Sequence, residues 1–420
     1  MFALARLATP GLGLLASAYA QVTALSPLKS VALSPAQPIV WNMAGDLIQP
    51  RYAHTATLLP NGKVMIYGGY TSDRPDQLTA LRTSELFDPV TRTWGQPTSA
   101  FYARVGHQAT LLTNGRVLVT GGVINARAEE IYNPATNSWY STTRMLEERL
   151  HHTATRLHNG KVLVAGGFNY ASTEKFGWLS SAEIYDPVTH TWTPTGKMST
   201  GRFSHVANLL PDGRVLVVGG HTTTGDATSA ELFDPATGTW SIASGTFYPR
   251  VGGMHRGTTL LDGSIVITGG YVNDTLGPSI PDVEVFSPKK LGFYSVGDLN
   301  EPRRYHEAAR LSNGKVIVAG GHHRTAKQPA GFTLTSTETY DPAKFVWTLV
   351  GHMNVARTNH TLTALPDGRV LAAGGQNQTD RALAQRTSEL FNSGFGVTPR
   401  GTTAPITSSV KNNQISRSVR

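Results

Sequence analysis

The sequence contains no cysteine among its 420 residues. Disulfide bonds, a thiolate nucleophile and a metal site with cysteine ligands are therefore excluded. Only 15% of the residues are charged, and although the formal net charge is +9, no Lys/Arg cluster is dense enough to predict nucleic-acid binding. Beyond the N-terminal stretch, no apolar run approaches the roughly 18 residues that a membrane-spanning helix needs. No transmembrane segment is expected.

The two ends of the chain differ in character from its middle. Residues 1–20 have the features of a signal peptide, since Arg6 precedes the apolar run GLGLLASAYA and small residues occupy Ala18 and Ala20. We therefore expect a secreted or periplasmic protein, cleaved near Ala20. Residues 21–37 are predicted to be a linker, and the polar, basic residues 396–420 a disordered tail.

Between these ends the sequence repeats itself seven times. Each repeat has an apolar run that ends in a Gly-Gly pair, and successive pairs lie 45–54 residues apart. Before each run stands an Asn-Gly or Asp-Gly dipeptide, for which we predict a two-residue hairpin turn. The Gly-Gly pairs begin at Gly68, Gly121, Gly166, Gly219, Gly269, Gly320 and Gly374.

A Gly-Gly pair, a later Glu-aromatic strand and a Trp about six residues further on resemble the Kelch repeat. The resemblance covers residues 38–395 and implies an all-β fold, a seven-bladed β-propeller with four antiparallel strands per blade. The propeller domain of galactose oxidase is similar, but the copper-radical site of that enzyme needs a cysteine, which this chain lacks.

The segment PIVWNMAGDL is a fourth strand without a repeat before it. Trp41 precedes His54 by the same 13 residues that separate Trp94 from His107, whereas the seventh repeat has no fourth-strand Trp of its own. Residues 38–47 are therefore predicted to complete blade seven and close the ring. Phe293 is expected to take the Trp position in its blade.

An Arg-x-x-His motif opens the innermost strand of most repeats, and a Glu opens the third strand. Because these residues recur, we interpret them as structural, through an Arg–Glu or His-to-backbone bond, although the Arg residues have the reach to line a central pocket. Blade five has His255 but Gly252 at the Arg position. The structural set is Arg51, His54, Arg104, His107, Arg149, His152, Arg202, His205, Arg303, His306, Arg357 and His360.

Departures from the repeat are the better candidates for ligand binding. They cluster after the Gly-Gly pairs, in the long loop of blade three and around the altered link of blade five, on the face where the loops vary. We expect no metal or other cofactor; a metal held by the His residues after the pairs is the weaker alternative, since these lie two blades apart. The candidates are Trp178, His221, Tyr271, Arg250, Arg256, His322, His323 and Arg324.

Rigid repeats with varied loops favour a binding protein that recognises a glycan or an extracellular protein through the face with the varied loops. We expect this protein to be a monomer. The alternative is a carbohydrate-active enzyme, a uronate polysaccharide lyase or a sugar epimerase, with His, Tyr and Arg on the same face. No catalytic residue is identified. A galactose-oxidase-like activity is not expected.

Overall fold

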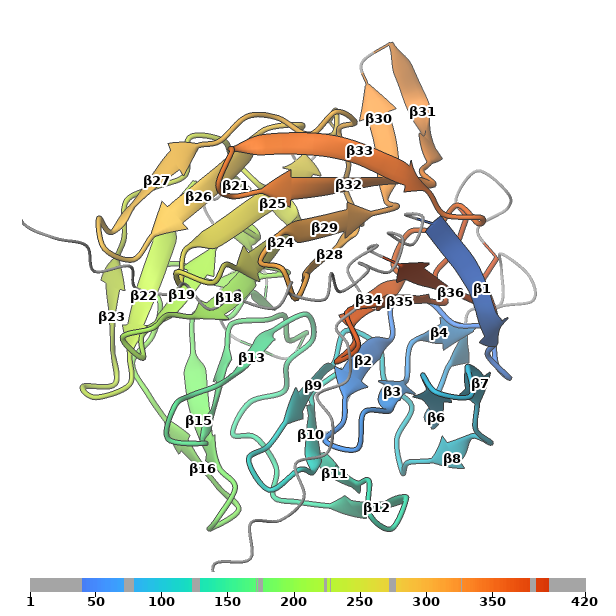
Figure 1. Ribbon diagram of the computed structural model, residues 1–420. Coiled ribbons are helices and arrows are strands. Elements are labelled where there is room, and N and C mark those ends of the chain that lie inside the picture. Colours follow the sequence, from blue (N-terminus) through green and yellow to red (C-terminus); the bar gives the residue numbers. More distant parts are fainter. Residues whose placement is uncertain are drawn as a thin grey trace, which may run out of the picture. The chain divides into compact units, whose positions relative to one another are not determined.

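The computed structural model describes residues 40–71, 79–122, 129–170, 172, 177–222, 225–226, 228–271, 277–325, 327–377 and 383–392. These residues belong to the compact unit Gln37–Arg420. The predicted signal peptide, linker and tail lie outside them. In the described part the elements are all strands, and Figure 1 shows the blades arranged in a ring. No described helix is long and apolar enough to cross a membrane.

Seven antiparallel sheets, each with four principal strands, form the blades. Blade one consists of β2 (Thr55–Leu58), β3 (Val64–Tyr67), β6 (Thr83–Asp88) and β7 (Thr93–Trp94), and the short strand β8 (Thr98–Ser99) pairs with β6. Blade two consists of β9 (Gln108–Leu111), β10 (Val117–Thr120), β11 (Glu130–Asn133) and β12 (Ser138–Ser141). Blade three consists of β13 (Thr153–Arg156), β14 (Val162–Ala165), β15 (Ala182–Asp186) and β16 (Thr191–Pro194). Blades four and five are β18 (Val206–Leu209), β19 (Val215–Val218), β22 (Ala230–Asp234) and β23 (Thr239–Ile242); and β24 (Val251–Thr259), β25 (Ile265–Tyr271), β26 (Val283–Ser287) and β27 (Gly292–Ser295). Blades six and seven are β28 (Glu307–Arg310), β29 (Val316–Ala319), β32 (Ser336–Asp341) and β33 (Val346–His352); and β34 (Thr361–Ala364), β35 (Val370–Ala373), β36 (Thr387–Asn392) and β1 (Val40–Asp46).

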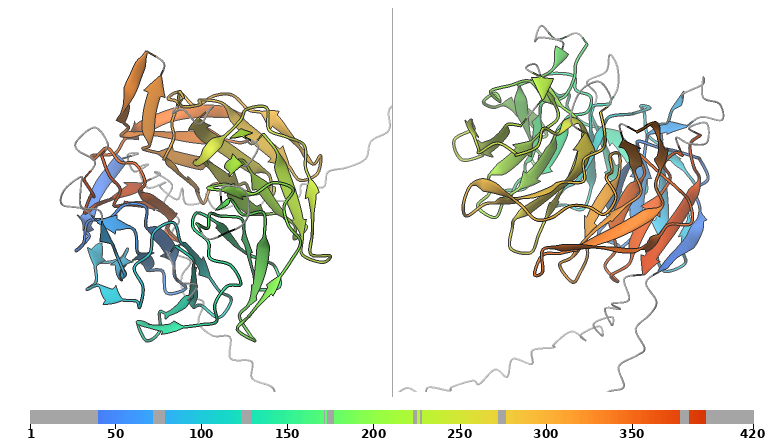
Figure 2. Two further views of the ribbon diagram at one scale, coloured as in Figure 1. Left: turned by 180° about the vertical axis from the view of Figure 1, so that it is seen from behind. Right: turned by 90° about the horizontal axis from the view of Figure 1, so that it is seen from above.

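Short strands decorate one end of the ring. They are β4 (Tyr70–Thr71) with β5 (Thr79–Ala80), β17 (Arg202–Phe203) with β20 (His221–Thr222) and β21 (Gly225–Asp226), and β30 (His322–Thr325) with β31 (Gln328–Thr333). We call this end the loop face, because it carries the Gly-Gly pairs and the links between blades. The opposite end, with the Asn-Gly and Asp-Gly turns, is the turn face. The β30–β31 hairpin projects from the blades in Figures 1 and 2.

Strand β1 closes the ring as predicted. It pairs with β36 in antiparallel register, with Val40 opposite Asn392 and Trp41 opposite Phe391. Figure 2 shows the blue strand beside the red ones. The indole Nε1 of Trp41 donates to Thr337 Oγ1 of blade six at 2.9 Å, so β1 also contacts the neighbouring blade.

The aromatic residue of the fourth strand has one role in every blade. It faces an aromatic residue of the third strand, with ring centroids 4.9–5.1 Å apart, a distance at which tilted rings attract each other. Phe293 opposite Phe286 takes this position in blade five, as predicted.

Apolar second strands supply most of the core. The side chains of strands such as β3 and β19 are buried along their whole length, and each hydrophobic cluster joins two adjacent blades. In one such cluster Val266 and Val285 of blade five pack with Val316 and Val318 of blade six. Burial on both faces explains why these strands read as continuous apolar runs.

The prediction of two-residue Asn-Gly turns was wrong in detail. In blade one the Leu59 N–H donates to Lys63 O, and the Gly62 N–H donates back to Leu59 O, so three residues form the loop. Only the glycine has positive φ, at 81° for Gly62. This is a type I turn followed by a glycine bulge, in which Asn61 Oδ1 caps the Lys63 N–H instead of adopting a left-handed conformation.

Candidate functional site in and around the central cavity

The repeated arginines form buried ion pairs. All seven pairs join the Arg that opens a blade to the Glu of its third strand, at 2.7–3.0 Å, and every one of these Arg side chains has no exposed surface. The pairs are Arg51–Glu85, Arg104–Glu130, Arg149–Glu183, Arg202–Glu231, Arg250–Glu284, Arg303–Glu338 and Arg357–Glu389.

Blade one shows how each pair is satisfied. The Arg51 guanidinium donates to Gly68 O at 3.0 Å as well as to Glu85, while Glu85 accepts the backbone N–H groups of Ile48 and Gln49 at 2.7 and 3.1 Å. A buried charge is tolerated when it is paired with an opposite charge and hydrogen-bonded, as it is here through every nitrogen of the Arg51 guanidinium except Nε. These charges connect strand, link and Gly-Gly pair within a blade and present no free group to a ligand.

Arg250 lies in one of these buried pairs, although it was predicted from the sequence to bind a ligand. Its Nη2 is 3.0 Å from Glu284 Oε2, and its Nη1 donates to Gly269 O. The register of β24 shifts between Val251 and His255. This bulge absorbs the two extra residues of blade five, so Arg250 reaches the position that Gly252 was expected to fill.

Six of the seven repeated histidines connect their blade to the one before it by a hydrogen bond, and His360 is the exception, with no partner at either ring nitrogen among the described residues. His107 Nε2 shares a hydrogen bond with Thr55 Oγ1 at 2.9 Å, and His54 Nε2 does so with Thr361 Oγ1 at 3.1 Å, across the closure. Burial, and after it the charge of Arg104, lowers the pKa of His107 to about 3. These rings are therefore neutral near pH 7.

The Gly-Gly pairs make room for these rings. Gly68 has a φ of +65°, and a Cβ there would lie 2.6 Å from Cε1 of His107 in the next blade. The second glycine donates its N–H across the same junction, from Gly69 to Arg104 O at 2.9 Å. Any larger residue would separate the blades, which accounts for the pair in all seven repeats.

One buried carboxyl stands apart from the ion pairs. Glu129, beside Glu130 in blade two, accepts the Gly121 N–H at 2.9 Å through Oε2, but its Oε1 has no partner. Burial raises its pKa from 4.5 to about 8. The folded protein thus keeps a proton that the unfolded chain releases above about pH 4.5, so this group costs stability progressively between pH 4.5 and 8.

We therefore expect Glu129→Gln to raise the free energy of unfolding by a few kcal/mol at pH 8 and by much less at pH 5. Glutamine retains the acceptor for Gly121 and carries no charge to desolvate. Urea unfolding at both pH values measures the free energy of unfolding of the variant relative to the parent. The contributions of the other titrating groups are the same in both proteins and cancel in this comparison. An equal difference at pH 5 and pH 8 would contradict the assignment.

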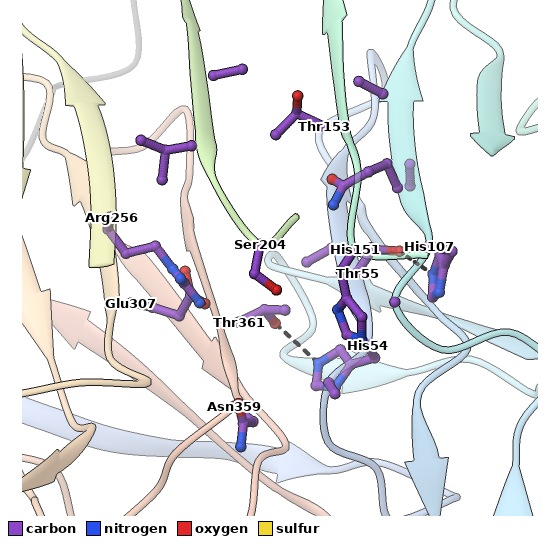
Figure 3. Close-up of a pocket in the computed structure, with 18 of the residues that line it drawn as sticks. His54, Thr55, His107, His151, Thr153, Ser204, Arg256, Glu307, Asn359 and Thr361 are labelled. Carbon is purple, nitrogen blue, oxygen red and sulfur yellow. Dashed lines mark hydrogen bonds and ion pairs between the residues drawn. The ribbon is translucent and has the colours of Figure 1, made fainter. Parts of the chain in front are cut away.

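The central cavity of the propeller has a volume of about 520 Å³. The loop-face ends of the seven innermost strands line it, and Figure 3 shows polar side chains directed into it. Arg256 of blade five meets Glu307 of blade six on its wall, with Nη2 and Oε1 2.5 Å apart. Burial opposes the charge of Arg256, but the charge of Glu307 and its hydrogen bond outweigh this and raise the pKa of Arg256. Both side chains keep some exposure, at 28% and 20%.

A ring of variable residues surrounds this cavity, and the sequence analysis missed it. Each member directly precedes the repeated histidine. Backbone hydrogen bonds run between members of adjacent blades, for example from Ser204 N to His151 O at 2.8 Å and from Asn359 N to Tyr305 O at 3.2 Å. We call Ala53, Gly106, His151, Ser204, Met254, Tyr305 and Asn359 the mouth ring.

Most mouth-ring residues have left-handed backbone, including His151 at φ 53° and Tyr305 at φ 55°. This conformation is uncommon for such side chains and is found where the surrounding structure imposes it. The one available signal was the variability of this position inside a fixed Arg-x-x-His motif.

Two of the predicted ligand-binding residues lie together in an aromatic cluster on blades three and four. The Phe203 ring stacks on the His221 ring with centroids 4.6 Å apart, and the Trp178 ring lies 5.3 Å from Phe203. Phe168 joins Trp178 by a β-bridge and packs against Tyr170, whose side chain is 73% exposed. Trp178 thus packs partly on its own loop and partly on the neighbouring blade.

Tyr271, His322, His323 and Arg324 gather on blades five and six instead. His322 bridges to Arg304, and burial lowers its pKa to about 4. His323 stacks on Phe332 at 5.0 Å. The two groups of histidines therefore belong to separate clusters, and the described residues contain no group of three or more His, Asp or Glu placed to hold a metal ion.

Comparison with known proteins places this architecture in a family. Residues 106–321 match the KLHDC2/KLHL20/DRC7 Kelch-repeats domain. Human Kelch-like protein 15 is 26% identical over 209 residues, which is 46% of this chain and 33% of that protein, so the chain matches about a third of its length. A fungal alcohol oxidase of the AA5 family, solved in complex with copper, superposes with a TM-score of 0.66 at 18% identity over 85% of this chain and 76% of its own. That likeness concerns the fold alone. Together with the seven-bladed ring, the domain match shows that the chain belongs to the Kelch-repeat β-propeller family.

Proposed function

We propose that this protein is a secreted, non-catalytic binding protein that recognises an extracellular protein at the loop face, around the mouth ring. Kelch propellers generally bind proteins, and fold alone leaves the partner open. The observation that carries the proposal is the contrast between two adjacent positions. The repeated Arg and His are buried in the junctions, whereas the residues between them vary from blade to blade and face the cavity.

The burial of the repeated Arg and His residues argues for binding rather than catalysis. General acid–base chemistry needs a group with a pKa near the working pH and access to the substrate. The repeated histidines are buried with strongly lowered pKa values, and Arg256 is engaged by Glu307. A lyase or epimerase would have to rely on side chains outside these sets.

A glycan is the second candidate, and the aromatic cluster of blades three and four favours it. The exposed Tyr170 ring beside Phe168, with Trp178 and the stacked Phe203–His221 pair nearby, offers flat apolar faces of the kind that pack against sugar rings. For either ligand, we propose that residues 1–20 direct secretion and that the protein acts as a monomer.

Photo-crosslinking from two positions tests the protein-binding proposal. A benzophenone amino acid replaces Ser204 in the mouth ring or, as the matched control, Asn159 in the exposed turn on the opposite face. Each variant is incubated with the native extracellular fraction and illuminated. The variant with the crosslinker at position 204 is expected to give a discrete adduct that the variant with the crosslinker at position 159 does not. Equal adducts from both positions, or none from Ser204, would contradict the proposal.

Binding to a glycan array distinguishes a glycan ligand from a protein partner. Selective binding that Trp178→Ala abolishes, together with no adduct at Ser204, would replace the protein partner with a glycan.

A further inference from the structure

Blade six contains one arginine that the ion pairs do not use. Arg304 follows the paired Arg303 and is only 4% exposed, yet its Nε and Nη1 have no hydrogen-bond partner. Its backbone is fixed, because Arg304 N donates to His322 O at 3.1 Å and His322 N donates to Arg304 O at 2.7 Å. A buried guanidinium with unmet donors is costly. Each of the seven paired arginines contacts a Glu carboxylate, and the ion pairs found among the described residues include none for Arg304.

Aromatic rings and a second cation surround this guanidinium. Its Cζ lies 5.4 Å from the ring centre of Tyr271 and 5.7 Å from that of Tyr305, within the range of cation–π attraction. Burial lowers the pKa of Arg304, the Tyr305 side chain opposes this, and the charge of Arg324 adds to the lowering. Ser279 holds the backbone of Arg324, with Ser279 N to Arg324 O at 2.9 Å and Arg324 N to Ser279 Oγ at 3.2 Å.

The charge balance of this cluster is positive. Arg304 and Arg324 repel each other, and His322 is held neutral by burial and by these two charges. None of the hydrogen bonds or ion pairs described for Arg304 involves a carboxylate, whereas Glu307 on the same blade is engaged by Arg256. Tyr305 belongs both to this cluster and to the mouth ring, so the cluster adjoins the cavity.

We propose that Arg304, Arg324 and the Tyr271 and Tyr305 rings form a subsite for a carboxylate group of an acidic peptide segment. The inference rests on the proposed function and names the chemistry of its partner. A planar guanidinium matches a carboxylate, and a charge-assisted hydrogen bond from Nε or Nη1 would satisfy a donor that the fold leaves open. Arg324 supplies the second charge, which favours an anion over a neutral amide.

Titration with an oligoglutamate peptide of defined length tests the subsite, measured by calorimetry at low salt. Arg304→Met is expected to weaken binding about tenfold or more, since it removes charge-assisted hydrogen bonds. Arg310→Gln is the matched control, because Arg310 is an exposed arginine of the same blade. It is expected to leave the affinity unchanged within about twofold. Equal affinity of parent and Arg304→Met would overturn the proposal.

Stability provides an independent readout. Because Arg304 is unpaired, Arg304→Met is expected to unfold at the same urea concentration as the parent or a higher one. A strong loss of stability without a change in peptide affinity would make Arg304 a structural residue and overturn the subsite. Binding of oligogalacturonate in place of oligoglutamate, dependent on Arg304, would overturn the peptide and assign the carboxylate to a glycan.

The crosslinking position separates this inference from the function on which it rests. A Ser204 adduct that forms equally well in the Arg304→Met variant would leave the protein-binding proposal standing and overturn the carboxylate subsite. An adduct that Arg304→Met reduces, but Arg310→Gln does not, supports both.

Discussion

Replacing Glu85 with glutamine is expected to lower the free energy of unfolding by about 3–5 kcal/mol. The substitution preserves shape but leaves the Arg51 guanidinium, which has no exposed surface, without its counter-charge. It also weakens the acceptor for the Ile48 and Gln49 N–H groups, which position the link from blade seven to blade one. Urea unfolding at pH 7 measures the loss.

Glu307→Gln is the matched control. The same substitution there breaks an ion pair with Arg256 whose side chains stay 28% and 20% exposed, so a loss of at most about 1 kcal/mol is expected. If Glu85→Gln lowered the free energy of unfolding no more than Glu307→Gln does, the buried Arg–Glu pair would not be the interaction that fixes the link between blades seven and one.

Removal of residues 1–46, which takes away β1, is expected to abolish cooperative unfolding of the ring or to lower its stability by roughly 5 kcal/mol or more. The deletion removes Trp41 and Ala44 from the core and exposes Phe391, the partner of Trp41. It also leaves the outer edge of β36 unpaired, an edge open to association with other chains. Thermal unfolding followed by circular dichroism and light scattering measures both effects.

A chain that begins at residue 37 is the control, because it retains β1 and should unfold like the chain that begins at residue 21. A peptide spanning residues 38–48, added in excess, is expected to restore part of the lost stability. A deletion variant that melts as sharply and at the same temperature as the control would show that β1 is not needed for closure.

Most of the fold could be predicted from the sequence because its signals are repeated. Seven Gly-Gly pairs, seven Asn-Gly or Asp-Gly dipeptides and a Trp at fixed distance from the next His reinforced one another. The 13-residue step from Trp41 to His54 was enough to assign a segment at the front of the chain to blade seven. The turn type was less predictable, since the dipeptide suits both a two-residue turn and a three-residue loop with a glycine bulge, and strand register decides between them.

The candidate site was harder to predict because it depends on contacts between blades. The approach of Arg304 to Tyr271 joins two blades, and no spacing in one repeat encodes it. The role of Arg250 could not be predicted from the repeat spacing, because a bulge in β24 changes which residue meets Glu284. Repetition identified what the blades share, but the mouth ring is defined by side chains that they do not share.

The pairing of β1 with β36 also sets how the ring responds to mechanical force. Val40 and Asn392 face each other at the same end of an antiparallel pair, and the segments before and after the ring are attached there. Tension between those two segments would load the hydrogen bonds one after another, from Val40 toward Asp46, rather than all of them together in shear. The strand that completes the ring is therefore also the one that pulling on the two flanking segments would open first.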